Sequence, residues 1–435
     1  MSIRTRRALF YLLTLMFMAS GALLVAYGIG TRLDFKTFSF KKTGGIYVRS
    51  DPTDAIINLN GVEVENQSGI INSGTFIDNL AEGSYKLSVN KDGYYGWVKS
   101  VEVKPSAVSV FEKVTLFPNI RPEGVFGPAD RFYVKDGTLI LEKDGEIRVS
   151  GEKIIGNRVI DFVDSGPIIT YRDDRKNYYL SDFSSNDSVL NINTLLNNLK
   201  ESRLGLPGTV PIVKVLFHPF NDKRLVIQTQ GALYNLDTVK LTIEKVADNV
   251  KDFTVGENRI IFLDSRGIFS YNLIFRNTSK LMEAPADRTL PKLNIDTSGR
   301  VFILESNGRL LMLNEDGNAI KIADKVREFS SSPQGQFLIF ADYDGPLTVY
   351  RIDKDKYLKL ETGLSKNIKT ITWYKDGGHV LIQDESNLYF VEIDDVLPLN
   401  IVRITNGVED FAYDNTENAI YFRNAKGIFK IVLEQ

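Results

Sequence analysis

The feature that most constrains this chain is an uncharged apolar segment close to its N-terminus. It runs from Ala8 to Gly30, with Arg4, Arg6 and Arg7 before it and Arg32 after it. At about 1.5 Å per helical residue the segment reaches about 34 Å, enough to cross a hydrocarbon layer of about 30 Å. The sequence therefore predicts a tail and transmembrane anchor over residues 1–30, with the lipid bilayer as partner of residues 8–30.

A cleaved secretory signal peptide is the alternative reading of this segment. Signal peptides also begin with basic residues, but their apolar cores span about 7–15 residues and end at a small-x-small site. This core is longer and lacks an Ala-x-Ala pattern, which favours an uncleaved anchor. Basic residues on the two sides are nearly balanced, so charge alone does not set the orientation. Three arginines lie tightly against the N-terminal side, and long C-terminal domains translocate largely regardless of charge. We therefore expect a single-pass cell-membrane protein with a cytoplasmic N-terminus and an extracytoplasmic bulk.

Composition excludes several classes of function. The chain has 435 residues and a formal net charge of −2, so bulk charge does not attract nucleic acid. It contains no cysteine, which removes disulfides, thiolate nucleophiles and cysteine–metal sites. His218 and His379 are its two histidines. With 43% hydrophobic residues the chain can build two or three cores.

Residues 44–118, after a juxtamembrane linker at residues 31–43, alternate between apolar and polar residues with the period of a β-strand. Turn signals such as Asn60-Gly61 separate the short runs. The pattern predicts a small antiparallel β-sandwich. Its six expected strands lie around Ile46–Val48, Ala55–Leu59, Thr75–Ile77, Tyr85–Val89, Val98–Val103 and Val108–Leu116.

This region resembles the PEGA domain family. The resemblance is carried by Ser50–Ala55, Asn60-Gly61, Leu80–Val89 and Lys91–Tyr94. Thr53 and Asp54 stand where the name motif has Glu-Gly, and no Thr-Pro precedes Ile77. The resemblance implies an extracytoplasmic β-module of surface-associated bacterial or archaeal proteins, whose Gly and Tyr residues serve turns and packing.

The remaining chain, residues 119–435, contains a repeat of about 40 residues, the length of a four-stranded propeller blade. One recurring piece has an aliphatic residue, any residue, an acid and Phe, and we call it the acid-Phe motif. Turns such as Ser332–Gly335 make the repeats loosely similar to TolB-like β-propeller repeats. The four clear copies of the acid-Phe motif are Val159–Phe162, Val250–Phe253, Val326–Phe329 and Val408–Phe411.

Hairpin turns between the middle strands of each repeat decide the predicted number of blades. We expect eight blades, with residues around Val125 supplying the outer strand of the last blade. If Arg131–Val134 closes the ring instead, seven blades remain. The eight turns are at Gly145, Asn177, Gly231, Gly267, Gly308, Gly345, Asn387 and Gly427.

An insertion at Ile192–Leu204 has a helical apolar stripe and is followed by Gly205 and Pro207. Such a helix could form a lid over one face of the propeller. Packing against the outer edge of a blade is the favoured interpretation, because one apolar stripe usually marks a packed face.

Enzyme motifs are mostly absent. There is no Gly-Lys phosphate loop, no Gly-x-Ser-x-Gly and no His-Glu-x-x-His. His218 and His379 fall in or beside blade turns, which explains them without catalysis. Asp342–Gly345 resembles part of a calcium loop, but a hairpin turn is favoured because the third acid and distal Glu are missing. The sequence does not show the distances between its 55 acids, so paired carboxylates for glycoside cleavage remain an alternative.

The sequence thus predicts no catalytic, cofactor-binding or metal-binding residue and no cofactor. We expect a membrane-tethered binding or scaffold protein whose propeller recognises a protein or a cell-envelope polysaccharide. The alternative is a surface enzyme, for example one acting on polysaccharide, with an acidic site at the propeller mouth.

Overall fold

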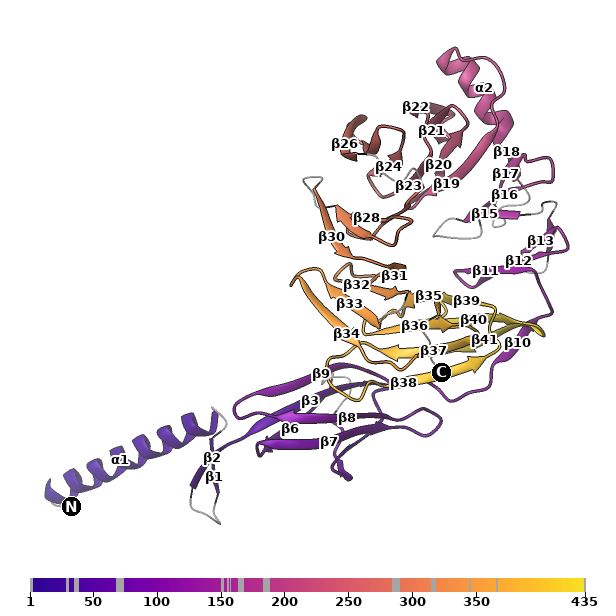
Figure 1. Cartoon of the computed structure of the whole chain (residues 1–435). Helices are drawn as coiled ribbons and strands as arrows, with labels where there is room; N and C mark the ends of the chain where they lie inside the picture. The colour runs from indigo at the N-terminus through magenta and orange to yellow at the C-terminus, as the bar shows by residue number, and fades with distance from the viewer. Residues whose placement is uncertain are drawn as a thin grey trace. The chain divides into compact units, whose positions relative to one another are not determined.

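The structure is a computed structural model of the whole chain (Figure 1). It describes residues 3–28, 31–34, 39–67, 74–149, 152–154, 156, 158–162, 168–182, 188–283, 290–313, 318–343, 346–364 and 367–433. The chain forms two compact units. The first comprises Met1–Ile120 and Asp394–Val402, and the second comprises Arg121–Ile393 and Arg403–Gln435.

The chain begins with helix α1, Ile3–Gly28. The predicted helix is thus present, but the predicted span over residues 8–30 is not supported. Among the described residues no helix is long and apolar enough to cross a membrane, and residues 29 and 30 lie outside them. The segment at residues 31–43, expected as a plain linker, instead contains a hairpin of β1 (Thr31–Asp34) and β2 (Ser39–Lys42).

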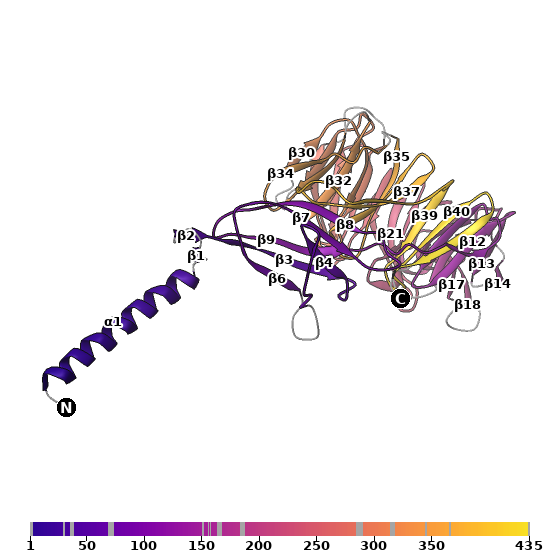
Figure 2. The ribbon, with the colours of Figure 1, turned by 90° about the horizontal axis from the view of Figure 1, so that it is seen from below.

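The sandwich region consists of two sheets, and β3, β6 and β9 of one sheet run side by side in Figure 2. The sheets have the orders β6-β3-β9 and β5-β4-β7-β8. Alternate side chains of both sheets meet in one core, which includes Ile46, Ile57, Leu87 and Trp97. The strands are β3 (Gly44–Asp51), β4 (Ile56–Leu59), β5 (Val62–Val64), β6 (Thr75–Leu80), β7 (Gly83–Asn90), β8 (Trp97–Val103) and β9 (Val108–Thr115).

Two details of the predicted sandwich are wrong. The pairing is not wholly antiparallel, because β3 and β9 are parallel, with Gly45 opposite Val108 and Val48 opposite Phe111. Alternation of apolar residues identifies a strand and its buried face but carries no information on the direction of its neighbour. The short strand β5 was also missed, because three residues are too few to show a period of two.

The second unit contains eight four-stranded sheets among the described residues, and seven of them are built from four consecutive strands. Figure 1 shows them in chain order from magenta to yellow. The predicted fold class is confirmed at the level of an all-β protein built from small sheets. In four of these sheets the strands are β11 (Arg131–Lys135), β12 (Thr138–Lys143), β13 (Glu146–Val149), β14 (Glu152–Ile154); β15 (Arg158–Phe162), β16 (Ile168–Arg172), β17 (Tyr178–Asp182), β18 (Ser188–Asn191); β19 (Ile212–His218), β20 (Asn221–Thr229), β21 (Ala232–Asp237), β22 (Thr242–Asp248); and β23 (Asp252–Val255), β24 (Arg259–Leu263), β25 (Gly267–Asn272), β26 (Asn277–Glu283).

Three further sheets follow the same order. Their strands are β27 (Lys292–Ile295), β28 (Val301–Leu304), β29 (Leu310–Leu313), β30 (Ala319–Ala323); β31 (Val326–Ser331), β32 (Phe337–Asp342), β33 (Leu347–Arg351), β34 (Lys356–Leu360); and β35 (Ile368–Trp373), β36 (His379–Asp384), β37 (Asn387–Glu392), β38 (Ile401–Asn406). The predicted middle turns at Gly145, Asn177, Gly231 and Gly308 fall between the second and third strands of their sheets, and Gly267, Asn387 and Gly427 are the first residues of third strands. Gly345 lies outside the described residues.

The eighth sheet joins the two ends of the second unit. It consists of β10 (Glu123–Phe126), β41 (Gly427–Val432), β40 (Ala419–Asn424) and β39 (Asp410–Asp414), in that order. Gly124 lies opposite Phe429, and β10 and β41 appear side by side in Figure 1. The predicted outer strand around Val125 is confirmed. The seven-blade alternative is wrong in its closing strand, because Arg131–Val134 lies in β11, which begins a sheet of its own.

The acid-Phe motif acts between neighbouring sheets. In β19 the ammonium group of Lys214 lies 2.7 Å from the Asp252 carboxylate and 4.9 Å from the centre of the Phe253 ring in β23. Lys292 of β27 repeats the arrangement with Glu328 and Phe329 of β31, at 3.0 and 5.5 Å. First strands of consecutive sheets are thus joined by an ion pair and a cation–π contact.

Helix α2, Ile192–Leu204, has the predicted bounds. The side chain of Asn191 caps its N-terminus by accepting a hydrogen bond from the Thr194 N–H, and Gly205 ends it in the left-handed conformation. Leu196 and Leu199 are buried in a core that includes Tyr178 and Leu236. The helix contacts β17, β18 and β22, so the packing interpretation is confirmed (Figure 1).

Candidate functional site

The candidate site lies at one end of the sheets of the second unit. Successive antiparallel strands reverse direction, so the turn between strands one and two lies at the same end as the turn between strands three and four. We call these the first and third turns, and their common end the first-turn end. First turns of neighbouring sheets are hydrogen-bonded to one another, as Thr297 Oγ1 donates to the Pro333 carbonyl at 2.9 Å.

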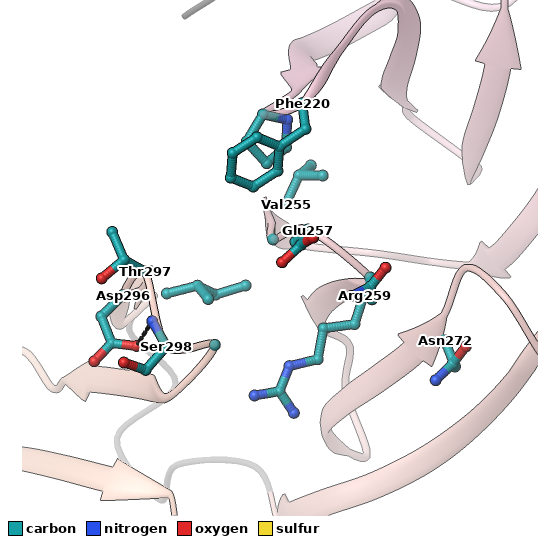
Figure 3. A pocket seen from close by; sticks show the side chains of 13 residues that line it. Phe220, Val255, Glu257, Arg259, Asn272, Asp296, Thr297 and Ser298 are labelled. Carbon is teal, nitrogen blue, oxygen red and sulfur yellow. Dashed lines mark hydrogen bonds between the residues drawn. The ribbon is translucent and has the colours of Figure 1, made fainter. Parts of the chain in front are cut away.

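A pocket of about 460 Å³ opens at the first-turn end, among the sheets that begin with β19, β23 and β27. Figure 3 shows Phe220 on one side, Thr297 and Ser298 on another, and the Arg259 guanidinium between these groups and Asn272. Glu257 also lines the pocket. An aromatic face, a cation, a carboxylate, amides and hydroxyl groups thus converge on one concave surface, which is the usual composition of a binding site.

His218 fixes the turn that carries Phe220. Its Nδ1 accepts a hydrogen bond from the Phe220 N–H at 3.2 Å, so the ring proton lies on Nε2, which donates to the Glu257 carbonyl at 2.7 Å. Burial lowers the pKa of His218, and the bond to Glu257 opposes this only in part. A neutral ring therefore joins two first turns at the edge of the pocket.

Asp296 lines the pocket but is committed to its own turn. Its carboxylate accepts hydrogen bonds from the N–H groups of Ser298 and Arg300, at 2.9 and 2.8 Å, and from Arg300 Nε at 2.8 Å. Its side chain is fully buried. Of the two acids that line the pocket, Asp296 is thus a turn residue and Glu257 is the exposed one.

Two third turns beside the pocket expose apolar side chains. The Asp237 carboxylate accepts hydrogen bonds from the N–H groups of Val239 and Lys240, and the side-chain oxygen of Asn272 accepts from those of Ile274 and Phe275. These bonds hold short turns of fixed shape. The apolar residues at the tips stand in water: Val239 is 65% exposed, Ile274 64% and Phe275 77%, and Phe220 of the neighbouring first turn is 74% exposed.

The corresponding turn of another sheet is polar. Between β33 and β34 the third turn carries Asp353, Lys354 and Asp355. Apolar residues at an exposed turn are therefore not required by this fold. We define the apolar tips as Phe220, Val239, Leu241, Ile274 and Phe275, because exposed apolar groups gathered on one surface mark interaction sites.

The other histidine is structural. His379 Nδ1 lies 2.7 Å from the Asp376 carboxylate, which also accepts hydrogen bonds from the N–H groups of Gly378 and His379. The ring stacks on Phe390 with centres 4.7 Å apart and is buried. The structure places His218 and His379 in different sheets, so they form no joint site.

The calcium-like fragment is only partly described, because Asp344 and Gly345 lie outside the described residues. Asp342 ends β32, at the opposite end of its sheet from the first turn. Burial raises the pKa of this carboxyl group, against the effect of Lys359 and Lys325. No group of three or more potential metal ligands occurs in the part of the chain that the structure describes.

Other acids with shifted pKa values also belong to turns. Burial raises the pKa of Asp264, but hydrogen bonds from the Arg266 side chain and backbone lower it overall. Asp173 shows the same balance, with Asn177 as the donor. Hydrogen bonds from Lys430 and Tyr421 lower the pKa of Glu417. These carboxylates are held ionised by neighbouring groups, which lie in the same turn for Asp264 and on strands β40 and β41 for Glu417. This is the reverse of what a general acid requires.

The apolar tips and the pocket residues were missed by the sequence analysis. An available signal was an apolar residue two positions after a turn-forming Asp or Asn, as Val239 follows Asp237 and Ile274 follows Asn272. The pocket itself had no such signal, since it is assembled from turns of three sheets.

Comparison with known proteins identifies one region. Residues 43–115 match the family described as "PEGA domain". No curated protein matches the chain.

Two solved structures show partial likeness. One is PorZ, described as an essential surface component of the type-IX secretion system of Porphyromonas gingivalis, at 14% identity and a TM-score of 0.40. The alignment covers 64% of this chain and 37% of that one, so the chain spans little more than a third of that protein. The other is KlHsv2 with loop 6CD replaced by a Gly-Ser linker, at 12% identity and a TM-score of 0.43, covering 63% and 98%.

At such low identities and TM-scores these two likenesses indicate neither a shared fold nor a shared function. The similarity to TolB-like repeats stays an expectation. The chain contains a PEGA domain, which the two-sheet module of the first unit forms over residues 43–115.

Proposed function

We propose that this protein is a membrane-attached, extracytoplasmic binding or scaffold protein that recognises a protein partner through the apolar tips and the pocket beside them. The observation that carries the proposal is the exposure of Phe220 and Phe275 on hydrogen-bonded turns at the end of the sheets where the pocket opens. Soluble surfaces seldom gather such side chains without a partner, and loops on a rigid scaffold commonly carry recognition.

The scaffold is a β-propeller of eight blades in this proposal. Its support is the eight four-stranded sheets, the contacts between first strands such as β15 with β19 and β39 with β11, and the last sheet that joins β10 to β41. A closed ring covers the sheet faces that an open row of sheets would leave exposed at its two ends. It also places all first turns on one face.

Attachment to the lipid bilayer is assigned to α1. Its apolar side chains are exposed, with Phe10 65%, Met16 64% and Phe17 78% exposed. Basic residues at its start favour the cytoplasmic side for the N-terminus. The PEGA domain supports an extracytoplasmic bulk, because the family resemblance implies such a location.

The enzyme alternative has less support. A glycoside hydrolase needs two carboxyl groups on either side of the scissile bond. In the pocket the Asp296 carboxylate is hydrogen-bonded within its own turn, which leaves Glu257 as the acid available to a substrate there. The alternative would gain if Glu257 proved to have a partner acid in the pocket with a bound substrate.

The recognition proposal is tested by a photoreactive phenylalanine analogue placed at position 220 or 275 in intact cells. We expect a covalent adduct of defined mass that protease destroys. The same analogue at Lys354, on the polar third turn at the same end, is the control and should give no adduct. An adduct that resists protease but is lost to glycan-cleaving enzymes would replace the protein partner by a polysaccharide. Absence of adducts at 220 and 275 contradicts the proposal.

Location is tested separately. Protease added to intact cells should digest the chain after Thr31 and leave α1 in the membrane fraction after extraction with alkaline carbonate. Protection until the cells are lysed would reverse the orientation, and release of α1 by carbonate would show that it does not enter the bilayer.

A further inference from the structure

Lys99 is the least expected residue of the PEGA module. It lies in β8 between Trp97 and Val101, on the face of the strand that points into the core, and its side chain has no exposed surface. A lysine at such a position requires a partner, because an unpaired buried charge is costly. The partners come from Asp394–Val402, the second segment of the first unit.

The ammonium group is held by this segment. Lys99 Nζ lies 2.5 Å from the Val396 carbonyl oxygen, to which it donates, and 3.1 Å from a carboxylate oxygen of Asp394. Asp394 also accepts a hydrogen bond from the Val396 N–H at 3.1 Å, and Val396 packs against the core of the module. The ammonium group of Lys99 is therefore paired with the Asp394 carboxylate and the Val396 carbonyl, while the Val396 side chain packs against the core beside it.

The backbone of β8 is paired by the same segment. β8 is the last strand of its sheet, so every second N–H and C=O along it points away from β7. The Asn400 amide satisfies both groups of Val98, accepting from its N–H at 3.0 Å and donating to its carbonyl at 3.2 Å. The Ser100 N–H donates to the Leu397 carbonyl at 3.2 Å. We call Asp394–Asn400 the strap.

We propose that the β8 edge of the PEGA domain is a peptide-recognition site, and that the strap is its ligand in this chain. The strap runs along the β8 edge as a bent segment. One main-chain bond, from the Ser100 N–H to the Leu397 carbonyl, and the side chains of Asp394 and Asn400 hold it there, so side-chain contacts give most of the specificity. Lys99 pairs with the acid Asp394, and the backbone of Val98 bonds to the side-chain amide of Asn400, six residues after that acid. The site accepts a bent segment of the type acid-x-apolar with an Asn six residues after the acid.

This inference is independent of the proposed recognition at the first-turn end, since none of its residues lies in that site. It also revises the limits of the module. The residues that match the PEGA family, 43–115, contain the buried lysine but not the acid that pairs with it.

The first test follows amide hydrogen exchange of β8 in the full chain. Asp394→Ala should speed the exchange of Val98 and Ser100 at least tenfold, because Lys99 loses its counter-charge. Asp395→Ala, at the exposed neighbouring acid, is the matched control and should leave both amides unchanged. Lys99→Met combined with Asp394→Ala should restore protection, because no charge is left unpaired. Equal protection in the wild-type chain, Asp394→Ala and Asn400→Ala would overturn the proposal.

The second test supplies the ligand separately. In the full chain the strap is replaced by a Gly-Ser segment of equal length, and a peptide with the sequence of residues 392–402 is added. The peptide should bind and restore slow exchange at Val98 and Ser100, whereas the same peptide with Asp394→Ala should bind at least tenfold more weakly. If the replacement prevents folding, the same chain carrying Lys99→Met is used with peptides that differ at Asn400. Failure of the unaltered peptide to bind either chain would overturn recognition at this edge.

Discussion

His218 shows how one side chain can fix the shape of a turn beside a binding pocket. Both ring nitrogens are used, one accepting from the Phe220 N–H and one donating to the Glu257 carbonyl. Protonation would place a hydrogen on Nδ1 and abolish the first of these bonds. The turn that presents Phe220 is therefore built for a neutral imidazole.

A pH dependence of stability follows from this geometry. Burial lowers the pKa of His218 below its value in the unfolded chain, so the unfolded state binds the proton more readily. The stabilisation is present above the unfolded pKa, near 6.5, and is lost as the pH falls through the lower, folded pKa. We expect the free energy of unfolding of the wild-type chain to fall relative to that of His218→Gln between pH 7 and 5. Urea unfolding at several pH values measures this, and parallel curves for the two proteins would refute it.

The partners of Lys99 and Lys214 were not predicted from the sequence, for two different reasons. In the predicted strand Val98–Val103, alternation places Val101 and Val103 in the core, and it puts Lys99 on the same buried face. Its partner Asp394 lies 295 residues later in the chain, and no local pattern relates the two. Lys214, by contrast, precedes its acid by 38 residues, close to one repeat, and could have been found by aligning the copies.

At the scale of elements, the acid-Phe motif lies on the first strands of the sheets, and its main effect is to link neighbouring sheets. The sequence showed an acid and Phe at the start of successive repeats, and the structure shows what they face: a lysine on the first strand of the preceding sheet. Asp161 performs the same task differently, accepting a hydrogen bond from the Phe217 N–H of β19 at 2.7 Å. In the fourth copy Asp410 instead accepts hydrogen bonds from Arg423 of its own sheet. Three of the four copies therefore link neighbouring sheets.

Removal of one such lysine should loosen one junction. Lys214→Met loses an ion pair and a cation–π contact at side chains that are 34% and 26% exposed, so we expect a cost of about 1 kcal/mol. Amide exchange of β19 and β23 should rise more than that of β31 and β35. Lys321→Met, which breaks an exposed pair with Asp324 inside one sheet, is the control and should change stability by less than about 0.5 kcal/mol. Equal costs for the two variants would show that the junction is held by apolar packing alone.

Elements with a strong local signal were predictable, and elements defined by pairing were not. The bounds of α2 follow from an apolar stripe, a capping Asn and a terminating Gly, all of which are local. The parallel pairing of β3 with β9 depends on which strand the chain returns to, and the hairpin of β1 and β2 has no alternating pattern. The pocket is harder still, because its lining comes from turns of three sheets.

At the scale of the whole molecule, the second unit is held together by the pairing of its first strand with its last. β10 comes from residues 123–126 and β41 from residues 427–432, and they pair with Gly124 opposite Phe429. The last sheet would otherwise end at β41, and the chain before β11 would have no partner. Each such unpaired edge is a site for aggregation as well as a loss of hydrogen bonds.

Two deletions separate the closing strand from the sheet that it closes. Replacing residues 121–126 by a Gly-Ser segment removes β10 and leaves β39–β41 intact, whereas deleting residues 427–435 removes β41, a central strand of that sheet. We expect both variants to lose stability and to self-associate through exposed edges. The second should lose more, because it leaves the hydrogen-bonding edge of β40 unpaired and removes the buried side chains of Ile428 and Ile431. Both keep the PEGA strands and the strap, so Trp97–Val103 should retain slow amide exchange. Thermal melting, size-exclusion chromatography and limited proteolysis measure these outcomes. A monomeric β10 variant as stable as the wild-type chain would show that this pairing does not close the second unit, and the proposed eight-bladed ring would lose its support.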